Sequence, residues 1–252
     1  MGERETYPKN PTFECIAASH RREALHALLK WGSPLTTNQL ATYLTATDLG
    51  TTSFDDSETE PVKTELEHVS LPALERTDLV DWNRNEGIVK TTTHPALGDP
   101  RFARLLELRV EGLEGVLAAL AHEFRRVCLT VLEAETESLS LTDQVREIRR
   151  RTPGTTGPDA REVTSIRSSL HHVHLPRLDG AGLVEYDPET GHATYSGSPA
   201  LEEVFAVIYE RDGPPEKLSG FFDGLTDSYR RARPEASTEL EWPHFWRTPH
   251  NG

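Results

Sequence analysis

One stretch of the chain occurs twice, and this duplication limits what the chain can fold into. Residues 62–87 read VKTELEHVSLPALERTDLVDWNRNEG and residues 166–191 read IRSSLHHVHLPRLDGAGLVEYDPETG, and a shift of 104 positions, which carries Leu71 onto Leu175, aligns them without a gap. The identical pairs are Leu66/Leu170, His68/His172, Val69/Val173, Leu71/Leu175, Pro72/Pro176, Leu74/Leu178, Leu79/Leu183, Val80/Val184 and Gly87/Gly191. A repeat of this length has the size of a small domain and is too long for a solenoid unit, so the sequence predicts two tandem domains.

Each copy has the pattern of a helix followed by a hairpin. In the second copy, apolar residues at helical spacing run from Leu170 to Leu178, and glycines at 180 and 182 then interrupt the pattern. An alternating strand over 183–186, a turn over 187–191 and a return strand over 193–195 follow. The first copy repeats this order with strands over 79–82 and 88–91. Helices that support the repeated stretch are expected over 13–29, 37–44, 116–132 and 141–151.

This pattern resembles the recognition helix and wing of winged helix-turn-helix proteins, including metal-sensor repressors of bacteria and archaea. The string His-x-x-Leu-Pro-x-Leu, followed by Leu-Val-[Glu/Asp]-[Tyr/Trp]-[Asp/Asn], is more closely similar to an uncharacterised winged-helix family of haloarchaea, here in tandem. The resemblance implies an α+β fold, mainly α, with two tandem winged helix-turn-helix domains joined by a helical connector. It also implies a DNA-binding transcriptional regulator.

The repeat and its flanks divide the chain into five parts. We expect a flexible arm over 1–12, a winged-helix domain over 13–98, a helical connector over 99–115, a second winged-helix domain over 116–210, and a C-terminal helix and aromatic tail over 211–252. The connector is expected to continue into the helix over 116–132 almost without a break. The apolar helix Leu201 to Tyr209 either packs on its own domain or forms an interface with another chain.

A proline lies inside each expected recognition helix. Pro72 and Pro176 each remove one backbone hydrogen bond, at a cost of about 3 kcal/mol in an ideal helix. We therefore expect a kink or a late helix start at both places.

The charge of the chain argues against a polyanionic partner at first sight. The 41 acidic and 27 basic residues give a net charge of −14. Lysine, however, is rare, and a surface rich in Asp, Glu and Thr resembles the surfaces of proteins from salt-loaded cytoplasms. At molar salt the Debye length is about 3 Å, so only charges in contact with a partner matter.

One long stretch of the chain is basic. Residues 144–177 contain seven arginines and three acidic residues, a net charge of +4. This stretch covers the expected helix-turn-helix of the second domain, so we predict that it contacts double-stranded DNA, with arginines on phosphates or guanine edges and histidines as neutral donors. The predicted DNA-binding residues are Arg149, Arg150, Arg151, Arg161, Arg167, His171, His174 and Arg177.

The first copy lacks this basic character. Its expected recognition helix, 62–78, contains Lys63 and Arg76 against four acidic residues, and an acidic loop, 48–61, precedes it. We expect the first copy to serve dimerisation or contact with a protein partner, through the post-wing helices. The alternative for the whole chain is a protein-interaction adaptor that keeps the fold without binding DNA.

The sequence gives no sign of enzymatic or cofactor chemistry. It contains no nucleophile, histidine and carboxylate in a hydrolase order, no metal-binding glutamate-histidine helix and no dinucleotide glycine motif. A metal site at His171, His172 and His174 is disfavoured, because no cysteine or carboxylate lies at a fixed spacing and His172 repeats His68, which points to a structural role. We predict no enzyme activity, no cofactor and no metal.

The remaining features indicate a cytoplasmic protein. Cys15 and Cys128 are not equivalent under the repeat and do not form a ligand or disulfide pattern. Neither a signal peptide nor an apolar run long enough to cross a membrane is evident, so no membrane partner is expected.

Overall fold

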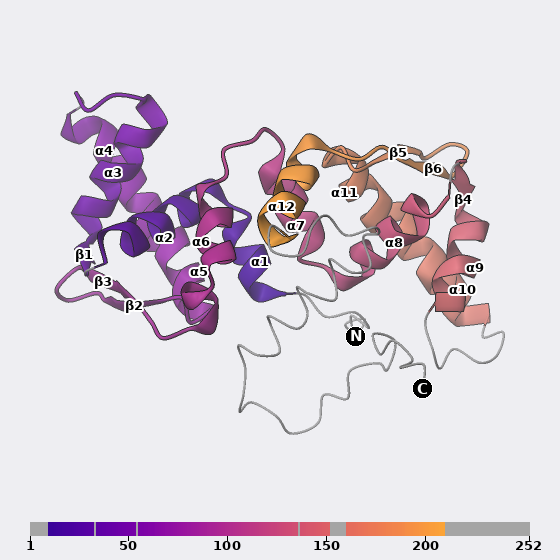
Figure 1. Cartoon of the computed structure of the whole chain (residues 1–252), viewed down its shortest axis with the longest axis horizontal. Coiled ribbons are helices and arrows are strands. Elements are labelled where there is room, and N and C mark those ends of the chain that lie inside the picture. Colours follow the sequence, from indigo (N-terminus) through magenta and orange to yellow (C-terminus); the bar gives the residue numbers. More distant parts are fainter. Residues whose placement is uncertain (1–9, 33, 54, 136, 152–159, 210–252) are drawn as a thin grey trace, which may run out of the picture. The chain divides into compact units, whose positions relative to one another are not determined.

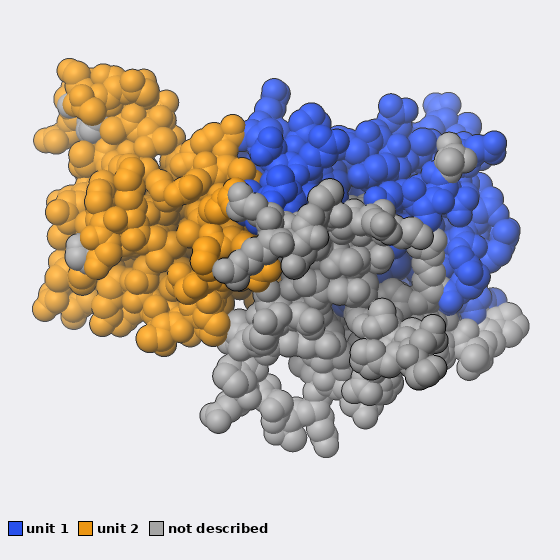
Figure 2. All heavy atoms as spheres, viewed as in Figure 1, with its two compact units in different colours: residues 1–9, 110–252 blue, residues 10–109 orange. Residues whose placement is uncertain are grey.

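The fold consists of two compact units with mainly helical structure and small antiparallel sheets. The structure is a computed structural model that describes residues 10–32, 34–53, 55–135, 137–151 and 160–209. Residues 10–109 form one unit, which we call the first repeat, and the described residues from 110 onward form the other, the second repeat (Figure 2, orange and blue). The predicted α+β class with two tandem domains is confirmed.

Apart from one 3₁₀ turn in the first repeat, the two repeats have the same order of elements (Figure 1). The first repeat contains α1 (Pro11–Ile16), α2 (Ser19–Trp31), β1 (Leu35–Thr36), α3 (Thr37–Leu49), α4 (Asp56–Glu65), the π-helical turn η1 (Leu66–Ser70), α5 (Leu71–Arg76), β2 (Val80–Asn83), β3 (Ile88–Thr91), the 3₁₀ turn η2 (Pro95–Gly98) and α6 (Pro100–Glu107). The second contains α7 (Leu113–Leu120), α8 (Glu123–Glu133), β4 (Leu139–Ser140), α9 (Leu141–Arg151), α10 (Ala160–Ser169), the π-helical turn η3 (Leu170–His174), α11 (Leu175–Gly180), β5 (Val184–Asp187), β6 (His192–Tyr195) and α12 (Pro199–Tyr209).

The sheets of the two repeats have the same register. Each is a three-stranded antiparallel sheet, in the order β1-β3-β2 and β4-β6-β5. Leu35 pairs with Val89 in the first repeat and Leu139 with Ala193 in the second, so the pairing follows the shift of 104 positions residue for residue. The short strands β1 and β4 were not predicted, because two residues are too few to carry an alternating pattern.

A π-helical turn accommodates the proline in each long helix. The N–H of Leu71 donates to the carbonyl of Leu66, and the N–H of Leu175 donates to the carbonyl of Leu170, five residues back in both cases. In an α-helix the ring of Pro72 would meet the carbonyl four residues earlier. The wider turn relieves that clash, so the chain continues as a helix through both prolines. The expected late start is wrong, because the helical path begins at Asp56 and at Ala160, well before each proline.

One buried arginine in each repeat, Arg22 and its equivalent Arg126, stabilises the end of the helix that precedes it. The buried Arg22 donates through Nη1 to the carbonyls of Ile16, at 2.9 Å, and Ala17. Arg126 donates in the same way to the carbonyl of Leu120 at 2.7 Å, and burial lowers its pKa to about 10. The last carbonyls of a helix have no hydrogen-bond donor within the helix, and they carry its negative partial charge. A buried arginine supplies both the donor and a compensating positive charge.

The helical segment between the repeats is less continuous than expected. α6 ends at Glu107 and α7 begins at Leu113 after Gly112, whose φ of +82° is left-handed. A second break separates α7 from α8, where the ring of His122 accepts a hydrogen bond from the N–H of Phe124 at 3.2 Å and caps α8. The prediction of a near-continuous helix was wrong because a capping histidine does not interrupt an apolar pattern.

The apolar face of α12 packs on its own repeat. Leu201, Val204 and Val207 are buried, and α12 contacts α7. Of the two roles expected for this helix, packing on its own domain accounts for these side chains. α1 begins at Pro11, inside the expected arm, while residues 1–9 and 210–252, with the expected C-terminal helix and aromatic tail, lie outside the described residues. No helix in the described part of the chain is long and apolar enough to cross a membrane.

Candidate nucleic-acid interface

The residues predicted to contact DNA lie on α9, α10, η3 and α11 of the second repeat. α9 and α10 contact each other, and α10, η3 and α11 form one helical path up to the β5–β6 hairpin (Figure 1). Arg149, Arg150 and Arg151 lie at the end of α9, Arg161 and Arg167 on α10, His171 and His174 in η3, and Arg177 on α11.

A groove with a neutral to basic lining follows α10. Its volume is about 620 Å³. The polar side chains that line it are those of Arg161, Thr164, Ser165, Ser168, Ser169 and His172, and no carboxylate is among the described residues of the lining. Hydroxyl, imidazole and guanidinium groups can all donate hydrogen bonds to phosphate or base oxygens, so the surface is chemically suited to a nucleic acid.

The arginines differ in how they are engaged. Arg167 and Arg177 are exposed, and neither forms an ion pair with another described residue. Arg161 is also exposed and lines the groove. The second repeat thus has three exposed arginines on the helical path of α10 and α11, one of which lines the groove.

The arginines of α9 are partly engaged with acids of the same helix. Nη2 of Arg150 lies 2.7 Å from Oε2 of Glu147, which raises the pKa of Arg150. Its side chain is 69% exposed, and such surface pairs contribute little to stability, so a phosphate could replace the glutamate. Arg149 is half-buried, and the side chain of Arg151 lies outside the described residues.

The structure corrects the prediction for His174. Its ring is buried, with 8% exposure, between those of His122 and Phe124, at centroid distances of 4.9 and 4.5 Å. Burial, followed by the charges of His122, Arg125 and Arg177, lowers the pKa of His174 to about 3. His174 is therefore a neutral core residue that cannot reach DNA.

His171 and His172 also exchange their expected roles. His171 is half-buried, and its Nδ1 lies 2.5 Å from the hydroxyl of Tyr186 on β5. The repeated His172, expected to be structural, is exposed and lines the groove. Its identity in both repeats suggested a structural role, and the spacing of the apolar residues around it gave no signal of its exposure. Among the described residues, no three histidine, cysteine or carboxylate side chains are grouped as metal ligands.

The equivalent surface of the first repeat is acidic. Residues 56–76 contain two basic and six acidic residues, a net charge of −4, whereas residues 160–180 contain three basic and two acidic residues, a net charge of +1. The expected acidic loop is partly helical, because α4 begins at Asp56. Oδ1 of Asp55 accepts a hydrogen bond from the N–H of Ser57 at 2.8 Å, and Glu58 completes the capping box. These carboxylates would repel a phosphate group, but they stabilise the start of α4.

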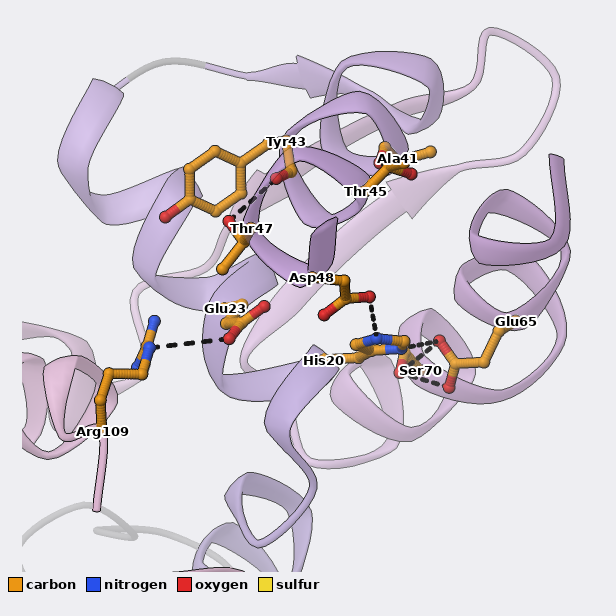
Figure 3. Close-up of polar contacts among 10 residues, drawn as sticks. All are labelled: His20, Glu23, Ala41, Tyr43, Thr45, Thr47, Asp48, Glu65, Ser70 and Arg109. Atoms are coloured by element: carbon orange, nitrogen blue, oxygen red, sulfur yellow. Dashed lines mark hydrogen bonds and ion pairs between the residues drawn. The ribbon is translucent and has the colours of Figure 1, made fainter. Parts of the chain in front are cut away.

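A polar cluster joins three helices of the first repeat (Figure 3). Nε2 of His20 lies 3.0 Å from Oδ2 of Asp48, and its Nδ1 lies 3.3 Å from Oε2 of Glu65. Ser70 Oγ donates to Oε1 of Glu65 at 2.9 Å. Burial lowers the pKa of His20, but the hydrogen bonds and charges of Asp48 and Glu65 outweigh it, so the pKa is raised. At the shift of 104, His20 and Ser70 correspond to Phe124 and His174, which pack ring against ring.

The first repeat also has an aromatic groove. Trp31, 46% exposed, and Tyr43 lie edge to face at 5.2 Å and line a groove of about 510 Å³ together with Leu35, Asn38 and Thr42. Glutamates occupy the equivalent positions, 135 and 147, in the second repeat. This surface is therefore peculiar to the first repeat.

The comparison with known families matches the repeat. A family model described as "Domain of unknown function (DUF7344)" matches residues 13–90 and 117–194, two segments offset by the same 104 positions. No curated protein and no solved structure matched the chain. The two segments together span more than half of the 252 residues. The chain therefore belongs to the DUF7344 family and carries two copies of its domain.

Proposed function

We propose that each repeat is a winged helix-turn-helix domain and that the chain is a DNA-binding transcriptional regulator that contacts duplex DNA mainly through the second repeat. The order helix, strand, helix, helix and hairpin supports this assignment, since such domains place the third helix in the major groove. In the second repeat, α10, η3 and α11 would form the recognition helix, and β5 and β6 the wing.

The observation that carries the proposal is the lining of the α10 groove. A chain with a net charge of −14 would carry carboxylates on most of its surface, yet none is among the described residues that line this groove. Arg161 is one of these lining residues, and Arg167 and Arg177 are exposed on the same helical path. Phosphate contacts by these arginines would fix the helix in the groove of DNA, while the hydroxyl and imidazole groups face the bases.

Titration of a labelled duplex with the full chain, from low to molar salt, tests the proposal. We expect a complex whose affinity falls with salt, and a triple variant with Arg161, Arg167 and Arg177 changed to Gln should bind weakly. Its salt slope should be smaller by about 3, because each phosphate contact contributes about 0.9. Arg149, Arg150 and Arg151 remain predicted contacts, and a second triple variant tests them separately.

The first repeat offers a matched control. Lys63 is equivalent to Arg167, and Arg76 lies on the corresponding helix, so the double variant Lys63→Gln and Arg76→Gln removes charge from the acidic repeat. This control should bind DNA as the wild type does. If the wild type forms no salt-sensitive complex with any duplex, the proposal is overturned.

A protein-interaction adaptor is the second candidate. The aromatic groove at Trp31 and Tyr43, together with the acidic α4, favours it, since exposed aromatic side chains are typical of protein interfaces. This candidate predicts that the DNA titration fails.

A further inference from the structure

We infer that His172 and Val173 form the base-reading element of the second repeat, with Val173 in contact with the 5-methyl group of a thymine. This inference rests on the proposed function. It names the residues that would give sequence preference, as distinct from the arginines that would give affinity.

The identities between the two recognition segments first point to this pair. Of the seven identical pairs over 56–76 and 160–180, three are buried leucines, which packing explains. The pair His68–Val69 and its equivalent His172–Val173 are exposed in both repeats, with Val69 at 55% and Val173 at 40% exposure. An exposed β-branched residue gains nothing from the core and has only moderate helix propensity. The core therefore gives no reason for its presence in both repeats.

The local backbone gives a second reason. Both residues lie within the π-helical turn η3, and such turns are rare in helices and frequent at functional sites. The turn presents His172 and Val173 on the surface, next to the groove along α10, which both side chains line.

The β5–β6 hairpin supports the position of His172 through His171. The hydroxyl of Tyr186 on β5 lies 2.5 Å from Nδ1 of His171, and the ring of His171 lies edge to face against that of His172 at 4.4 Å. A side chain held in this way loses less entropy when it binds. The first repeat has Glu67 and Trp82 at the equivalent positions, so it lacks this support for His68. His171 is thus a positioning residue.

The chemistry of the pair suits the major groove. An imidazole can donate to, or accept from, the edge of a base, and an exposed apolar side chain can pack on the methyl group by which thymine differs from the other bases. The hydroxyl groups of Thr164, Ser165 and Ser168 add contacts that suit any base. Among the side chains that line the groove, the valine is thus suited to single out thymine.

A thymine-to-uracil scan tests the inference. The wild-type full chain first selects a preferred duplex from a random-sequence pool, and each thymine of that duplex is then replaced by deoxyuridine, which removes only the methyl group. At one position we expect the wild type to lose about fourfold in affinity, as expected for one buried methyl group. Val173→Ala should bind the thymine and uracil duplexes equally, and His172→Ala should reduce the preference for the selected duplex over a random one roughly tenfold.

Val69→Ala, in the first repeat, is the matched control and should keep the response to uracil. Val173→Ala should melt as the wild type does, because the side chain is exposed. If no thymine is sensitive, or if Val173→Ala and the wild type respond alike, the inference fails although DNA binding stands. If the wild type selects and binds no duplex, the proposed function itself fails.

Discussion

The junction between the first long helix and the recognition segment is polar in the first repeat and aromatic in the second. In the first, His20 bridges Asp48 and Glu65 from the surface, whereas in the second Phe124 packs on the buried His174. Both junctions support the same backbone register. The difference shows that a helix of this fold can be held either by directional polar contacts or by packing of rings.

The outer face of the same segment differs as well. In the second repeat it has exposed arginines and a groove with no carboxylate among the lining residues that the structure describes, and in the first it begins with the capping carboxylate of Asp55. The residues that the repeats share are mainly those of the core and the turns. Duplication thus preserved packing and register, while the exposed surfaces of the two segments diverged.

The largest expected effect concerns the two junctions. Phe124→Ala should destabilise the second repeat by about 3–5 kcal/mol, because it leaves a cavity beside His174. His20→Ala should cost the first repeat only about 1 kcal/mol, since its partners are partly exposed. Hydrogen exchange followed by mass spectrometry on the full chain resolves peptides from each repeat. Equal losses of stability in Phe124→Ala and His20→Ala would contradict the contrast between the packed and the polar junction.

The buried arginines should behave alike in both repeats. Arg22→Met and Arg126→Met each leave helix carbonyls without a donor, at an expected cost of about 2–3 kcal/mol. Urea denaturation of each variant measures the loss. Arg84→Met is the control, because the exposed Arg84 pairs with Glu75 on the surface and its loss should leave the urea midpoint nearly unchanged. A large loss in one repeat alone would show that the shared arginine has diverged in role.

The two repeats should respond to pH in opposite directions. The pKa of His20 is raised above 6.5, so its contribution is full below pH 6.5 and is lost as pH rises through the folded-state value. The pKa of His174 is lowered from 6.5 to about 3, so its contribution is full above pH 6.5 and is lost as pH falls toward 3. One proton changes the free energy of unfolding by at most about 1.4 kcal/mol per pH unit.

Hydrogen exchange against pH, with His20→Phe and His174→Phe as references, isolates these two groups from their charged neighbours. Those neighbours are Asp48, Glu65 and Glu23 around His20, and His122, Arg125 and Arg177 around His174. Each variant should flatten the pH response of its own repeat only. A flat response in the wild type would contradict the opposite signs.

The smallest expected effect comes from one turn. Asp78 has a φ of +56°, and its equivalent Gly182 has a φ of +67°. Gly182→Ala should cost about 1 kcal/mol by strain alone, since a Cβ there meets no other atom within 4 Å. Asp78→Gly should leave the first repeat as stable or slightly more stable. Thermal melting detects both changes, and a marked loss in Asp78→Gly would show that the aspartate has a further role.

Sequence reasoning recovered the parts of the fold that depend on periodicity. The repeat, the hairpins, the support helix α9 and the post-wing helix α12 follow from apolar spacing and turn residues. The start of α4 was misplaced because Asp55 and Asp56 suit a loop and a helix cap equally well. The break before α8 was missed because the capping histidine lies between two apolar runs.

The candidate site was recovered only in part. The arginines of α10 and α11 are exposed, as a DNA contact requires. The roles of His171, His172 and His174 depend on a π-helical turn, which changes the face on which each side chain lies, and sequence spacing assumes a regular helix. A proline four residues after His172 was the visible sign that this spacing would fail.

The cap at Asp55 has a consequence for engineering the first repeat. The start of a helix attracts anions when its backbone amides are unpaired. At the start of α4, Oδ1 of Asp55 already accepts the hydrogen bond of the Ser57 amide, and the acidic residues of the first turn add further negative charge. Grafting arginines onto α4 would leave this repulsive end in place. Conversion of the repeat into a nucleic-acid binder would have to begin by replacing the cap with a neutral serine or threonine.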